Sequence, residues 1–196
     1  MLKLGAVFLL FMVHCEAQGP FHAMADNFGQ VYQVSVDPSG SESVTANIVG
    51  PLLNGPIGTG TPVPAAVPTP THIAFAATNQ GIWSKRTNPA GFILSSDLDT
   101  IPRLVTDGEW RCNQHDEKVE PDGAAINWPR SDAAMTAVKE DAAKYADLLP
   151  AVALYPNWNF DYGNTRFIDL GANWIWYAGV GLTGNPAIQV VCMKKL

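Results

Sequence analysis

Proline and glycine interrupt this chain so often that only short structural elements can form. The 196 residues include 15 prolines and 17 glycines. Residues 50–70 alone hold six prolines and four glycines, which neither a helix nor a central strand accommodates. Apolar residues make up 47% of the chain and charged residues 15%, a balance too apolar for a disordered protein. The sequence therefore predicts one turn-rich, mainly β domain in which residues 50–70 form a long surface loop.

Short apolar runs with an alternating pattern predict the strands of this domain, at residues 31–36, 44–49, 72–78, 90–94, 103–105, 173–177 and 187–192. One helix is expected at residues 131–149, because apolar side chains recur there every three or four positions. Ser131 can cap the start of this helix, and Pro150 follows its end. We expect an antiparallel β-sandwich with one helical insertion.

The N-terminus and the cysteines indicate an extracellular protein. Residues 1–17 combine an early lysine, an apolar run and a small-residue cleavage site, which is typical of a secretory signal peptide. Residues 18–196 then form one domain with two cysteines, Cys112 and Cys192. In an oxidising compartment they can pair, closing a loop of about 80 residues and adding about 4 kcal/mol of stability. Two buried thiols or intermolecular bonds remain the alternative.

Several short motifs follow one another along most of residues 22–194. They are residues 25–32 (ADNFGQVY), 72–79 (HIAFAATN), 88–93 (NPAGFI), 106–112 (TDGEWRC), 128–129 (WP), 172–176 (ANWIW) and 191–192 (VC). In their order and spacing these motifs resemble those of galactose-binding-domain-like jelly rolls found in secreted, often marine invertebrate, proteins.

The resemblance implies a secreted jelly-roll β-sandwich that is related to carbohydrate-binding modules. The closing Val191-Cys192 matches a family segment whose cysteine pairs with the earlier one, so the resemblance implies the same Cys112–Cys192 bond. Trp110, Trp128, Trp174 and Trp176 correspond to framework positions and are expected in the core. The resemblance names no particular sugar, since one fold hosts many functions.

A glycan site needs aromatic faces for the C–H surfaces of sugars and planar amides or carboxylates for their hydroxyls. Two segments offer this mixture. One holds Trp83 and Asn88. The other is a denser run of Asn157, Trp158, Asn159, Phe160, Asp161 and Tyr162. The alternative for the aromatic residues of the second segment is that they cover the edge of the sandwich as packing residues.

Metal binding and catalysis have weaker support in the sequence. Jelly rolls of this kind sometimes bind calcium through loop oxygens, and Asp26, Asn27 and Asp107 are candidate ligands for a structural ion. Zinc-site spacings are absent, as are the motifs GxSxG, Walker A and GxGxxG. A catalytic pair of carboxylates like that of a glycosidase could be assigned only by analogy, to residues 97 and 99 or to residues 116, 117 and 120.

Three functions follow from these observations. We expect a non-enzymatic extracellular module that binds a glycan or an insoluble matrix polysaccharide. The alternative is a structural component of an extracellular matrix such as a calcified shell or skeleton, with other matrix proteins as partners. A small secreted glycoside hydrolase ranks last. The formal charge of −6 argues against nucleic acid as a partner, and no later apolar segment is long enough to cross a membrane.

Overall fold

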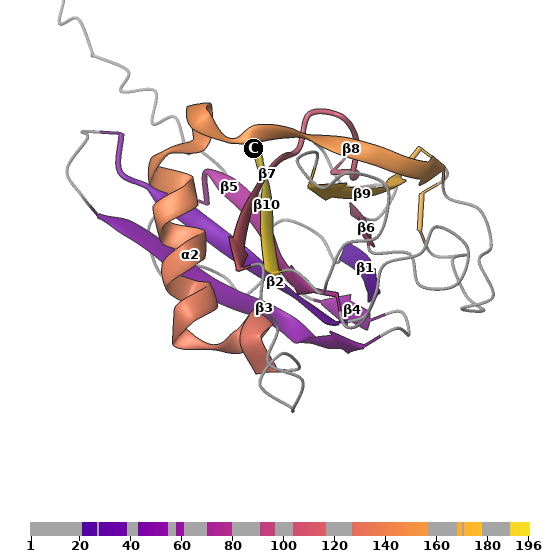
Figure 1. Cartoon of the computed structure of the whole chain (residues 1–196), viewed down its shortest axis with the longest axis horizontal. Helices are drawn as coiled ribbons and strands as arrows, with labels where there is room; N and C mark the ends of the chain where they lie inside the picture. The colour runs from indigo at the N-terminus through magenta and orange to yellow at the C-terminus, as the bar shows by residue number, and fades with distance from the viewer. Residues whose placement is uncertain are drawn as a thin grey trace, which may run out of the picture.

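The structure of the chain is a computed structural model, shown in Figure 1. It describes residues 21–26, 28–38, 43–54, 58–60, 70–79, 91–96, 104–116, 127–156, 168–169, 171–177 and 189–196. Among these, residues 26, 58–60, 116 and 152–156 are described by their backbone only.

The described chain is mainly β and contains one α-helix, which confirms the predicted fold class. The strands are β1 (Phe21–Asp26), β2 (Phe28–Val36), β3 (Val44–Asn54), β4 (Gly58–Gly60), β5 (His72–Thr78), β6 (Gly91–Ser96), β7 (Arg111–Asp116), β8 (Leu149–Pro156), β9 (Asn173–Tyr177) and β10 (Gln189–Lys195). The helical elements are η1 (Trp128–Arg130), α2 (Asp132–Ala143) and η2 (Tyr145–Asp147).

All ten strands belong to one antiparallel, hydrogen-bonded sheet in the order β3-β2-β5-β10-β7-β8-β9-β6-β1-β4. The two halves of this sheet meet at β8, which pairs with β7 near its start and with β9 along its length. Side chains from both halves share a single core, so the halves pack face to face as in a β-sandwich. This arrangement is compatible with a jelly roll.

Aromatic rings connect the two halves across this core. Phe75 of β5 stacks on Phe92 of β6 with 4.2 Å between ring centroids, and Phe92 meets the edge of Trp110. Beside them the disulfide joins Cys112 of β7 to Cys192 of β10, which lie directly opposite each other on neighbouring strands. The pairing predicted from the sequence is therefore present.

The opposite face of β2, β3, β5 and β10 packs against α2, the orange helix in front of these strands in Figure 1. Ala74 and Ala76 of β5 point towards the helix, and their small side chains allow it to lie close to the sheet. Tyr32 donates a hydrogen bond from its hydroxyl to the carbonyl of Pro129 and so holds η1 against β2. Burial raises the pKa of Tyr32 to about 12, which keeps this donor protonated.

Several predicted elements differ in their bounds from the structure, and in place of the strand expected at residues 103–105 Val105 forms only an isolated bridge with Ser95. The helix expected over residues 131–149 ends at Ala143, where Lys144 leaves the helical conformation and the short 3-10 turn η2 follows. Beyond this end, Arg111 donates from Nη1 to the carbonyls of Ala146 and Leu148. Leu149 then pairs with Cys112 and begins β8. Part of the loop expected at residues 50–70 is strand as well. It forms the end of β3 and all of β4, the two outermost strands, where proline and glycine are tolerated.

Candidate functional site

The predicted glycan-binding side chains lie outside the described residues, but the strands that flank them are described. Trp83 and Asn88 fall between Asn79, after β5, and Gly91, the first residue of β6. The run from Asn157 to Tyr162 follows the end of β8. These two segments are therefore attached to different parts of the framework.

The two segments leave the framework at different strands. The first lies between the end of β5 and Gly91, where β6 begins. The second begins after Pro156, the last residue of β8, which pairs with Asn173 of β9. The described strands therefore attach the two segments at different places, while the predicted side chains themselves lie outside the described part.

Unsatisfied polar atoms gather at the base of the segment that carries Trp83. Thr78 and Asn79 are 0% and 1% exposed. Within the described part of the chain, Thr78 Oγ1 and both side-chain polar atoms of Asn79 have no hydrogen-bond partner. A buried polar atom without a partner costs about 1–3 kcal/mol, so these three atoms favour a polar group that approaches from this end.

The calcium prediction is not supported by the position of Asp107. Its Oδ2 lies 2.8 Å from Lys194 Nζ, and its Oδ1 accepts a hydrogen bond from the amide of Glu109. Asp26 pairs with Gly91 at the far end of the sheet, and its side chain and Asn27 lie outside the described part. No three His, Cys, Asp or Glu side chains in the described ranges group closely enough to hold a metal ion.

Lys194 is the centre of a compact group of charges at this position. Its ammonium lies 2.8 Å from Asp107 and 2.9 Å from Glu109. Burial alone would lower the pKa of Lys194, but the hydrogen bonds to these two carboxylates outweigh burial and raise it. The lysine therefore stays charged and its charge is fully compensated.

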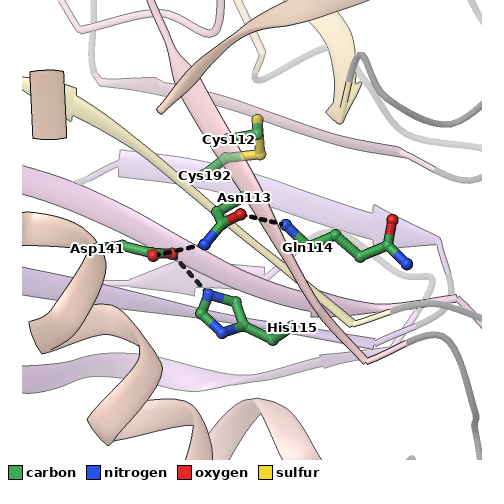
Figure 2. Close-up of a disulfide and its surroundings, with 6 residues drawn as sticks. All are labelled: Cys112, Asn113, Gln114, His115, Asp141 and Cys192. Carbon is green, nitrogen blue, oxygen red and sulfur yellow. Dashed lines mark hydrogen bonds and ion pairs between the residues drawn. A yellow bond between two sulfur atoms is a disulfide. The ribbon is translucent and has the colours of Figure 1, made fainter. Parts of the chain in front are cut away.

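A second polar cluster, which the sequence did not predict, lies between β7 and α2 (Figure 2). Asp141 of the helix is 3% exposed. Its Oδ1 accepts a hydrogen bond from Asn113 Nδ2 at 2.9 Å, and its Oδ2 lies 2.7 Å from His115 Nε2. Asn113 and His115 point away from the disulfide because neighbouring residues of a strand face opposite sides. The cluster was missed because residues 111–116 were not predicted as a strand.

This cluster fastens the helix to the sheet. An imidazole paired with a buried carboxylate also forms two parts of a nucleophilic triad. Within the described part of the chain, however, no hydroxyl or thiol is hydrogen-bonded to His115, whose other ring neighbour is Trp128 with 6.4 Å between centroids. The geometry of these residues therefore indicates a structural link. The carboxylate side chains considered for a glycosidase, at 97, 99, 116, 117 and 120, lie outside the described part.

The four tryptophans expected in the framework are all buried, which confirms that prediction. Trp110, Trp128, Trp174 and Trp176 are between 0% and 8% exposed. Among the described residues no aromatic side chain is fully exposed, and Tyr145 and Tyr177 are half-buried.

Comparison with protein-family models, with curated protein sequences and with solved structures finds no match to this chain. The resemblance to galactose-binding-like domains thus depends on its short motifs, and the structure supports the coarser statement of a mainly antiparallel β fold. The buried disulfide suggests an oxidising environment. No helix in the described ranges is long and apolar enough to cross a membrane.

Proposed function

We propose that this chain is a secreted, non-enzymatic module of the galactose-binding-like jelly-roll type that binds an extracellular glycan or an insoluble matrix polysaccharide. The observation that carries the proposal is the group of unpartnered, buried polar atoms on Thr78 and Asn79, directly before the segment with Trp83 and Asn88. Hydroxyl-rich ligands supply both donors and acceptors to such atoms. Trp83, four residues after Asn79 in the sequence, has the indole that would supply the apolar face that sugar rings require.

The framework suits a binding module. Its interior is filled by interlocked aromatic side chains and closed by a disulfide between two central strands. A rigid framework of this kind orders the ends of β5 and β6, and a preordered site loses less entropy when a ligand binds. Ligand recognition then falls to the segments between strands, where binding residues commonly lie.

The proposal is tested by a glycan array together with pull-downs on chitin, cellulose and calcium carbonate. We expect the wild-type protein to bind at least one sugar or polysaccharide and Trp83→Ala to lose at least tenfold in affinity. Trp158→Ala is the matched comparison, because residue 158 follows β8, whereas residue 83 follows β5.

Four outcomes separate the alternatives. Retention on an insoluble polysaccharide without binding to soluble sugars identifies a matrix component. Turnover of a glycoside, or the absence of any glycan binding by the wild-type protein, contradicts the proposal. An equal loss of affinity in Trp83→Ala and Trp158→Ala contradicts the assignment of the site to the segment after β5.

A further inference from the structure

Strand β2 lies beside β3 (Figure 1), and neutral polar side chains of these two strands interrupt the apolar inner face of the sheet. Val31 of β2 and Val49 of β3 pair with each other and belong to the core between the two halves of the sheet. Residues two and four positions from them share this face, because side chains alternate along a strand. The next two pairs on this face are Gln33 with Asn47 and Ser35 with Thr45.

These four side chains form what we call the β2–β3 polar patch. Two of them, Gln33 and Ser35, are only 5% and 6% exposed. The other two, Asn47 and Thr45, are exposed to solvent. The patch therefore has a buried row on β2 and an exposed row on the edge strand β3, with directly opposed side chains about 5 Å apart.

An unsatisfied acceptor lies in the buried row. Within the described part of the chain, Gln33 Oε1 has no hydrogen-bond partner. An unpaired buried carbonyl oxygen destabilises the fold, and an apolar side chain of similar size would avoid that cost. The exposed Asn47 amide beside it offers two further donors and an acceptor. A ligand hydroxyl that donates to Gln33 and contacts Asn47 would satisfy both side chains.

Charge restricts the ligand class. In the same row across the sheet, Gln33 pairs with Ile73, and Ile73 pairs with Lys194. Two strand spacings, about 10 Å, separate Gln33 from this lysine. Its ammonium is already held by Asp107 and Glu109, so the group carries one excess negative charge. An anionic ligand would be repelled there, whereas a neutral ligand would not.

We propose that Gln33, Asn47 and Thr45 form a second sugar-binding site, which holds a neutral oligosaccharide through hydrogen bonds alone, without an aromatic face. This inference rests on the proposed glycan-binding function. Phe28 pairs with Thr78, and Gln33, five residues further along β2, pairs with Ile73. The two sites therefore lie about 17 Å apart along the sheet. Two separated sites on one module bind a polysaccharide with higher avidity than either site alone.

Calorimetric titration with neutral cello-, chito- and galacto-oligosaccharides tests this second site. We expect Asn47→Ala to lower the number of bound oligosaccharides from two to one, or to reduce affinity at least tenfold. Gln33→Leu should have the same effect on binding. The matched control is Asn54→Ala, since Asn54 is also an exposed asparagine on β3 but lies at its far end. That variant should bind like the wild-type protein.

Thermal unfolding of each variant separates a binding defect from a folding defect. Gln33→Leu should unfold no earlier than the wild-type protein, because it removes an unsatisfied acceptor. If the wild-type protein binds and Asn47→Ala binds equally well, the second site is refuted while the proposed function stands. Preference for sulfated or uronic oligosaccharides that depends on Asn47 also refutes it. If the wild-type protein binds no oligosaccharide, both proposals fail.

Discussion

Replacement of Gly29 by alanine tests how tightly the two halves of the sheet pack. A Cβ atom at Gly29 would lie 2.5 Å from Phe75 Cζ and 2.7 Å from Ala25 Cβ, well inside van der Waals contact. The Phe75 ring has no room to move, because it stacks on Phe92, which in turn meets Trp110. All three rings are 0% exposed. The added methyl group therefore forces a shift of strand backbone.

The size of the effect follows from two opposing contributions. Overpacking a well-packed core costs typically about 1–3 kcal/mol, and the immobile neighbours of Gly29 place this variant near the upper end. Alanine also restricts the unfolded chain more than glycine does, which stabilises the fold by about 0.4–1 kcal/mol. We expect Gly29→Ala to lower the free energy of unfolding by about 2 kcal/mol. For a domain of this size the melting temperature then falls by about 4–8 °C.

Urea unfolding followed by tryptophan fluorescence, with the disulfide intact, measures this loss. Gly108→Ala is the matched control, because a Cβ there meets no atom within 4 Å. Gly50 is the only described glycine with a positive φ, so alanine fits the backbone at residue 108. The control should keep or slightly raise the stability. Equal urea midpoints for the two variants would refute the packing argument.

Two further predictions concern the disulfide and pH. The double variant Cys112→Ala, Cys192→Ala should lose about 2–5 kcal/mol in urea unfolding, since the bond joins residues 80 apart; an unchanged midpoint would contradict this. Burial, together with the charge of Lys195, lowers the pKa of His72 from 6.5 to about 4. Because the unfolded chain binds this proton more tightly, stability should fall by up to about 3 kcal/mol from pH 6.5 to 4. His72→Gln should flatten that decline, and an equally steep profile would count against it.

Local patterns in the sequence identified the elements whose two faces are apolar. Residues 72–78 and 173–177 form β5 and β9 with the expected bounds. Ser131 caps α2 by accepting a hydrogen bond from the amide of Ala134, as predicted. In each case the physical reason, alternation of side chains or a helix cap, lies within a few neighbouring residues. The prediction of these elements therefore needed no distant contact.

Elements that depend on distant partners were missed. In strand β7, Cys112 is followed by polar residues such as Asn113 and His115, a pattern that is typical of a loop. Only the contacts with Asp141 and with strand β10 show that this segment is a strand. The end of the helix was also misplaced, because residues 146–149 instead contact Arg111 and Cys112 of β7. The calcium prediction stays untested, because the side chain of Asp26 and residue 27 lie outside the described part.

The sequence by itself determined a mainly β domain with one helix and one pair of cysteines, since these follow from hydrophobic alternation, turn residues and composition, which are local properties. Only the tertiary structure decided which polar side chains meet. Strand register places Gln33 beside Asn47 and leaves Thr78 and Asn79 at the end of β5, away from that patch. Register is set by contacts between residues far apart in the chain, so no local pattern contains it.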